Sequence, residues 1–150
     1  MKRMILSLCA VAMMAGCATT QKEKYQSIRE NEVPEKYSRD FHKRRADVDQ
    51  VNWQMADSNC YIASFKSNDN TVRMKFRNTS VETSWLIPSE YTPSNITDYI
   101  KANYEGYKTE EVNIVEIRNQ KTYRVSIYKK KDFKLLEFDL QGTFVQEVED

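Results

Sequence analysis

The sequence predicts an α+β fold made of two tandem helix-plus-four-strand motifs, with both helices packed on one face of an antiparallel sheet. Residues 60–76 and 122–138 show the same hairpin pattern and align without a gap, so that Tyr61 matches Tyr123 at a spacing of 62 positions. Apolar and polar residues alternate along both hairpins, which is typical of antiparallel strands with one buried and one solvated face. A short amphipathic pattern precedes each hairpin.

The first residues have the layout of an export signal. Two basic residues precede an apolar stretch of eleven residues, 5–15, which is too short for a transmembrane helix of about 20 residues. The stretch ends in Met14-Ala15-Gly16-Cys17, which resembles the lipobox of bacterial lipoproteins, and this resemblance implies cleavage before Cys17 and acylation of that cysteine. We therefore expect residues 1–16 to be a lipoprotein signal peptide. An ordinary secretory signal with an incidental cysteine is the alternative.

Residues 17–32 predict a flexible tether, because they combine few apolar side chains with many Lys, Glu and Gln. The domain is then expected to cover residues 33–150, with repeats at 33–88 and 92–149. Several acyl chains on Cys17 would make a stable anchor, since each buried methylene contributes about 0.8 kcal/mol.

The first repeat is expected to begin with a short helix. Pro34 suits a first helical turn, where its missing N–H costs nothing, and Tyr37 and Phe41 lie four positions apart on one side. So narrow an apolar stripe gives a marginal helix unless it lies on a sheet. Alternation then predicts strands near residues 51–56, two more in the hairpin, and a fourth at 81–87.

The second repeat is expected to follow the same order. Thr92 is suited to cap a helix that begins at Pro93, and Gly106 is suited to end it in a left-handed conformation. Strands are predicted at residues 112–117, in the second hairpin, and at 143–148. Because one helix on four strands buries little, we expect the two repeats to share a joint core. The expected core residues are Tyr37, Phe41, Trp53, Tyr61, Phe65, Met74, Phe76, Ile96, Ile100, Val125, Ile127, Leu136 and Phe138.

Three stretches carry a resemblance to a known family. They are residues 48–53, Val-Asp-Gln-Val-Asn-Trp; residues 103–107, Asn-Tyr-Glu-Gly-Tyr; and residues 138–142, Phe-Asp-Leu-Gln-Gly. With the preceding helix and the charged hairpin, they resemble the PepSY-like, β-lactamase-inhibitor-like (BLIP-like) lipoproteins of Bacteroides and relatives. The resemblance covers roughly residues 33–149 and implies a periplasmic or surface lipoprotein, with no catalytic residues to carry across. A shared fold does not transfer an activity.

Composition and motifs argue against an enzyme. The formal net charge is +1 and only three glycines occur, which disfavours nucleic-acid binding and phosphate-cradling loops. Cys60 would be the remaining thiol of the mature domain, and we expect it to be an inert, half-buried residue rather than an intermolecular disulfide or a nucleophile using His42. One histidine without paired cysteines or carboxylates predicts no metal site, and no cofactor is expected.

The face of the sheet opposite the helices is the predicted partner-binding surface. It combines aromatic, apolar and charged side chains, as protein interfaces do, although a merely solvated polar face is the alternative. The candidate partner-binding residues are Arg73, Lys75, Arg124, Tyr128 and Glu137, with Ile62 and Leu135 beside them. Two basic runs, residues 43–45 and 129–131, are expected to be solvated, the second being an alternative contact for anionic lipid.

The sequence therefore predicts a non-enzymatic binding module, anchored through Cys17 in the bacterial envelope. The outer membrane, on its periplasmic or surface side, is the expected location. An envelope protein is the expected partner, and an envelope hydrolase that the module inhibits is one candidate by analogy of fold. The alternative is a structural or sensory lipoprotein that binds cell-wall material or a small ligand.

Overall fold

A computed structural model describes residues 25–148. Within that range one antiparallel sheet contains nine strands in chain order. The strands are β1 (Gln26–Ile28), β2 (Asn52–Asp57), β3 (Cys60–Ser67), β4 (Asn70–Phe76), β5 (Val81–Ile87), β6 (Lys108–Ile117), β7 (Gln120–Lys129), β8 (Asp132–Phe138) and β9 (Phe144–Val148). The helices are α1 (Glu35–Arg44) and α2 (Ser94–Asn103), with 3-10 turns η1 (Glu30–Glu32) and η2 (Ser89–Tyr91).

The predicted fold class of two repeated helix-plus-four-strand motifs is wrong. The molecule is mainly one nine-stranded antiparallel sheet, to which α1 and α2 add short helical segments. The expected boundary at residues 88–92 does not interrupt the sheet, because β5 pairs with β6 from Glu82 opposite Ile117 to Ile87 opposite Val112. The spacing of 62 positions shows that the two hairpins are alike in sequence, but the backbone ladder runs through both without a break.

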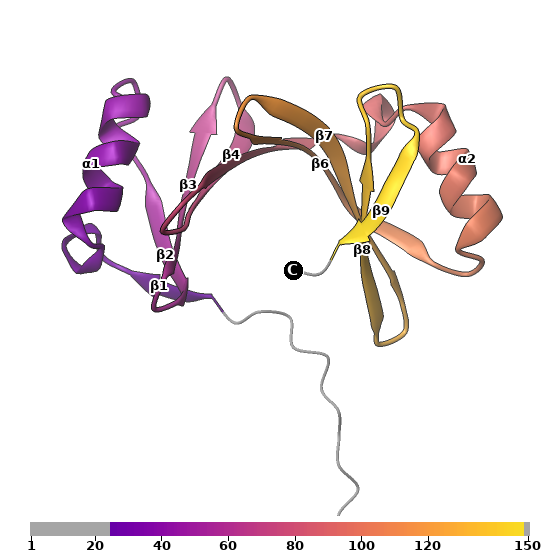
Figure 1. Cartoon of the computed structure of the whole chain (residues 1–150), viewed down its shortest axis with the longest axis horizontal. Helices are drawn as coiled ribbons and strands as arrows, with labels where there is room; N and C mark the ends of the chain where they lie inside the picture. The colour runs from indigo at the N-terminus through magenta and orange to yellow at the C-terminus, as the bar shows by residue number, and fades with distance from the viewer. Residues whose placement is uncertain (1–24, 149–150) are drawn as a thin grey trace, which may run out of the picture.

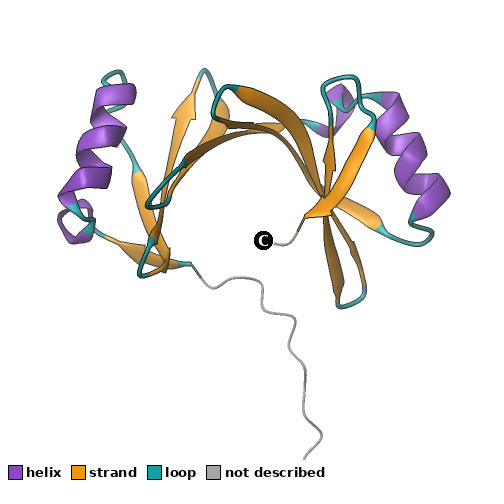
Figure 2. Ribbon diagram, viewed as in Figure 1, coloured by secondary structure: helices purple, strands orange, loops and turns teal. Residues whose placement is uncertain are grey.

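The sheet is bent into an arch (Figure 1). Both helices lie on its outer, convex face, α1 near one end and α2 near the other, and the strands between them form the span (Figure 2). The inner, concave face carries no helix in the part of the chain described here. Right-handed twist accumulating over many strands curves a sheet, and helices covering only its two ends leave the opposite face open.

All thirteen expected core residues are buried, but the expected joint core is wrong. One cluster lies between α1 and strands β2 to β4, and the second lies between α2 and strands β6 to β8. Phe41 packs edge-on against Trp53 and Phe65, with 5.5 Å between ring centroids in each pair. In the second cluster Tyr99 stacks on Phe144 at 4.7 Å. The helices are too far apart along the arch to share a core.

Part of the predicted tether belongs to the fold. Strand β1 pairs with β2, placing Ile28 opposite Trp53, and η1 follows directly. The Glu30 carboxylate lies 2.5 Å from His42 Nε2 on α1, and the Glu32 carboxylate accepts a hydrogen bond from the Arg29 backbone N–H at 2.8 Å, which lowers the Glu32 pKa. Residues 26–32 are therefore held to the sheet and to α1, in contrast to the tether expected there.

Thr92 and Gly106 do not have the roles predicted for them at the two ends of α2. The helix begins at Ser94 after Pro93, with no side-chain cap, and the buried Thr92 hydroxyl finds no hydrogen-bond partner among the described residues. Gly106 has the expected left-handed φ of 79°, but it lies beyond the helix, in a turn closed by the Tyr107 N–H donating to the Tyr104 carbonyl at 3.1 Å. The helix itself has already ended at Asn103.

We expect Gly142→Ala to destabilise the fold more than Gly106→Ala. Both glycines have a left-handed φ near 78°, which costs an alanine about 1 kcal/mol. A Cβ at Gly142 would also lie 2.4 to 2.7 Å from the Asn95 amide group, whereas one at Gly106 meets only the flexible end of Lys129 at 3.1 Å. Asn95 would have to give up its 2.5 Å bond to the Gln141 carbonyl. Urea unfolding of the two variants measures the difference in their free energies of unfolding, which we expect to be about 1 kcal/mol or more. Equal losses of stability in the two variants would contradict this prediction.

Candidate binding face

The concave face of the arch forms a hollow of about 1390 Å³. Strands β2 to β8 contribute to it, together with Tyr25, the first described residue. Its lining is a mixture of charged, polar and apolar side chains. The lining residues are Tyr25, Gln54, Ile62, Arg73, Lys75, Glu82, Ser84, Thr109, Glu110, Glu111, Asn113, Val115, Arg124, Ser126, Tyr128, Lys130, Lys131, Asp132, Phe133 and Leu135.

The hollow brings the predicted partner-binding residues together. Arg73 and Lys75 on β4, and Arg124 and Tyr128 on β7, all line it. Glu137 on β8 is not part of the lining, but it lies opposite Arg124 in the β7–β8 ladder and is paired with it. Successive strand residues point to opposite faces, so the alternation that buries one set against the helices directs the other set into the hollow.

A charged network crosses the floor of the hollow. The Arg124 guanidinium lies 2.9 Å from the Glu82 carboxylate on β5 and 3.6 Å from the Glu137 carboxylate on β8. All three side chains are largely buried, with Arg124 15% exposed, and its Nε finds no hydrogen-bond partner among the described residues. Glu82 was not among the predicted site residues, because it lies 42 positions from Arg124 and only the order of the strands brings the two close.

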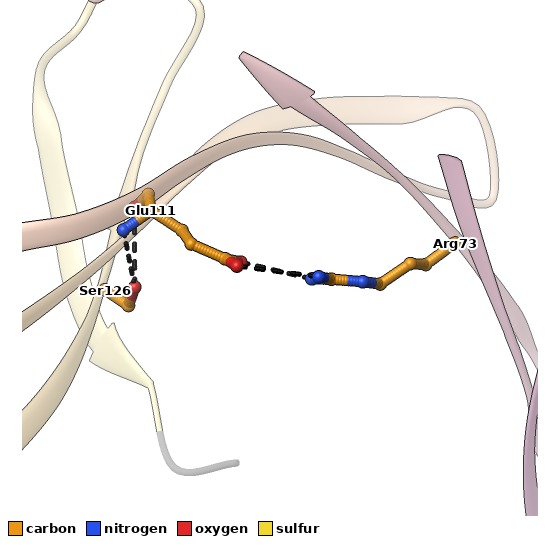
Figure 3. A network of polar contacts seen from close by, with 3 residues as sticks. All are labelled: Arg73, Glu111 and Ser126. Carbon is orange, nitrogen blue, oxygen red and sulfur yellow. Dashed lines mark hydrogen bonds and ion pairs between the residues drawn. The ribbon is translucent and has the colours of Figure 1, made fainter. Parts of the chain in front are cut away.

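A second ion pair spans the hollow along a diagonal. Arg73 on β4 reaches toward Glu111 on β6 (Figure 3), and its two terminal nitrogens lie 3.1 and 3.5 Å from the carboxylate oxygens. Glu111 is held in turn by Ser126, whose hydroxyl accepts a 3.0 Å hydrogen bond from the Glu111 N–H. The β6–β7 register shifts between Thr109 and Glu111. Such a bulge re-aims a strand's side chains, and here it accompanies the turn of Glu111 toward the hollow.

The rim of the hollow at the β7–β8 turn is aromatic and basic. Tyr128 and Phe133 lie opposite each other in the ladder and are 39% and 44% exposed. The Tyr107 hydroxyl donates to the Asp132 carboxylate beside them, and this bond raises the Tyr107 pKa. Lys129 donates to the Glu105 carbonyl at 2.8 Å, so that part of the predicted solvated run 129–131 has a structural contact.

The other candidate residues do not line the hollow. Cys60 is 2% exposed, and the His42 imidazole on α1 contacts the Glu30 carboxylate. Among residues 25–148 no group of His, Cys, Asp or Glu has a metal-binding arrangement. In the basic run 43–45, Arg44 pairs with Asp40 at 3.0 Å. Arg45 lies over the Phe65 ring and pairs with Asp47, a bond that raises the Arg45 pKa and lowers that of Asp47.

The expected lipidation site Cys17 and signal peptide lie outside the described residues. No helix in the described part of the chain is both long and apolar enough to cross a bilayer. Comparisons with protein-family models, curated proteins and solved structures found no match for this chain. The resemblance to the PepSY-like and BLIP-like lipoproteins therefore stays a prediction.

Proposed function

We propose that this protein is a membrane-anchored envelope lipoprotein whose concave sheet face binds another protein without catalysing a reaction. The observation that carries this proposal is the hollow itself. Its volume of about 1390 Å³ exceeds the 300 to 1,000 Å³ typical of small-molecule pockets. An open hollow of this size suits a rounded protein surface or loop better than a small ligand.

The chemistry of the lining supports a protein partner. Arg73, Lys75 and the half-exposed Tyr128 line the same hollow, and aromatic residues and arginine are the types enriched at interface hot spots. The Arg73–Glu111 pair already holds its guanidinium in place, so that little side-chain freedom is lost when a partner binds. An envelope hydrolase that this protein inhibits is the candidate partner that the family resemblance suggests.

The first test is a cross-linked pull-down of the acylated protein from its own envelope, followed by affinity measurement with the purified partner. Arg73→Ala, Lys75→Ala and Tyr128→Ala together are expected to raise the Kd about thirtyfold or more, which corresponds to one hot-spot residue of about 2 kcal/mol. We exclude Arg124 from this variant because its removal would disturb the fold.

The matched control removes the same three residue types elsewhere. Arg39, Lys43 and Tyr91 are all exposed and do not line the hollow, and their replacement by alanine should leave the Kd unchanged. Equal affinity of both triple variants would overturn the concave interface. Enrichment of glycan or a small molecule, with no protein partner, would favour the alternative of a lipoprotein that binds cell-wall material. Turnover by the captured hydrolase, with and without this protein, then tests inhibition.

A further inference from the structure

A second, smaller pocket lies on the convex side of the sheet, beside α1. Its volume of about 430 Å³ is within the roughly 300 to 1,000 Å³ typical of small-molecule pockets, and it shares no lining residue with the concave hollow. Residues of α1, of the β4–β5 turn and of the β6–β7 turn line it, together with Val81 and Thr83 on β5. These two lie opposite Phe76 and Met74 of the α1 cluster in the β4–β5 ladder, and so they point to the side of the sheet that α1 covers.

The two carboxylates that line this pocket are already paired with cations. Asp40 lies 3.0 Å from the Arg44 guanidinium one turn along α1, and Glu116 lies 3.4 Å from the Lys121 ammonium. Lys36 and Arg118 also line the pocket, and neither is paired with a carboxylate of the described residues. The pocket therefore has an excess of positive charge, in a protein whose formal net charge is only +1.

Neutral groups hold the Lys36 side chain in place without cancelling its charge. Its ammonium donates a hydrogen bond to Asn78 Oδ1 at 3.0 Å and lies 4.5 Å from the centre of the Tyr37 ring. The Tyr37 hydroxyl donates to the same Asn78 oxygen at 3.0 Å. Because an ammonium has three N–H donors and the Asn78 oxygen accepts from one, Lys36 keeps donors for an anionic ligand.

Arg118 occupies a turn position that its residue type disfavours. The two-residue β6–β7 turn consists of Arg118 and Asn119, with left-handed φ values of 50° and 66°. Glycine, asparagine and aspartate suit such positions, and the β3–β4 turn has Asn68 and Asp69 there. Arginine adopts this conformation at an energetic cost, and its exposed side chain makes no hydrogen bond or ion pair with the described residues. A strained residue that does not stabilise its own turn indicates a role for its side chain in binding.

We propose that this pocket binds a small organic anion, with Lys36 and Arg118 contacting its carboxylate or phosphate oxygens. The guanidinium offers a planar pair of N–H donors and the ammonium a compact charge, and both suit such oxygens. The site is separate from the surface proposed for a protein partner, because the two have no lining residue in common. It depends neither on the lipid anchor nor on which partner the hollow binds.

Isothermal titration calorimetry of the full-length protein in neutral detergent tests the pocket with two probes, glutarate and glycerol 3-phosphate, at constant ionic strength. We expect at least one of them to bind with one-to-one stoichiometry, and the tighter of the two shows whether the pocket prefers carboxylate or phosphate. Their uncharged analogues, glutaramide and glycerol, should not bind. Absence of binding by both anions, or equal binding of the uncharged analogues, would overturn the proposal.

The variant Arg118→Asn separates binding from folding. Asparagine suits the left-handed turn, so this variant should be at least as stable in urea as the native protein, while its Kd for the bound probe rises about tenfold or more. Lys36→Gln should raise the Kd by a similar factor, whereas Arg39→Gln and Lys101→Gln, at exposed positions outside the pocket, should leave it unchanged. An unchanged Kd in Arg118→Asn would refute the site. Partner affinity tests the hollow separately, so failure of the pocket is distinguishable from failure of the proposed function.

Discussion

Phe41→Ala is expected to lower the free energy of unfolding by about 4 kcal/mol, the largest effect of any single change proposed for this protein. The ring is fully buried and lies edge-on to Trp53 and Phe65, so its removal loses apolar burial and leaves a cavity under α1. Denaturation in urea, followed by circular dichroism, measures the loss. Tyr91→Ala, at an exposed aromatic residue, should change stability by less than about 0.5 kcal/mol.

A double variant tests whether the core is divided into two independent clusters. Phe41 and Phe138 belong to separate clusters at opposite ends of the arch. The milder changes Phe41→Leu and Phe138→Leu, each costing about 1 kcal/mol, should therefore add to within about 0.5 kcal/mol in the double variant. Coupling well above that value would mean that the two helices act on one joint core and that the division into two clusters is wrong.

Arg124→Met is expected to destabilise the protein by about 3 kcal/mol, at the lower end of the range for breaking a buried ion pair. The change leaves the Glu82 and Glu137 carboxylates without the guanidinium that pairs with both. Their side chains are only 23% and 16% exposed, so water compensates poorly for the lost charge. Urea unfolding again gives the magnitude.

Neutralising both carboxylates should restore part of the stability that Arg124→Met loses. In the triple variant Arg124→Met, Glu82→Gln, Glu137→Gln no uncompensated charge remains, and we expect it to recover about 2 kcal/mol relative to Arg124→Met alone. Arg73→Met, which breaks the more exposed pair with Glu111, should cost less than about 1 kcal/mol. If Arg124→Met lowered the free energy of unfolding no more than Arg73→Met does, the Arg124 network would contribute no more to stability than a surface ion pair.

Much of the candidate site could be predicted from the sequence, but the pairs within it could not. Alternation along residues 72–76 separates Met74 from Arg73, and this local pattern directs the first to the core and the second to the hollow. Glu111 was not predicted as a partner of Arg73, because 38 positions separate them and a bulge in β6 lies beside Glu111. Such a register shift cannot be predicted from the spacing of residues in the sequence.

The sequence by itself determined most of the buried core, but not all of it: Ile62, predicted on the open face, and Cys60, expected to be half-buried, are only 4% and 2% exposed. The two-residue period of a strand and the four-residue spacing of Tyr37 and Phe41 are local properties of the backbone, so the thirteen expected core residues could be assigned before any strand was paired. Only the tertiary structure decided that the strands form one arched sheet with two separate clusters. Pairing between distant segments such as β5 and β6, and the curvature that accumulates over nine strands, arise from contacts that no local pattern records.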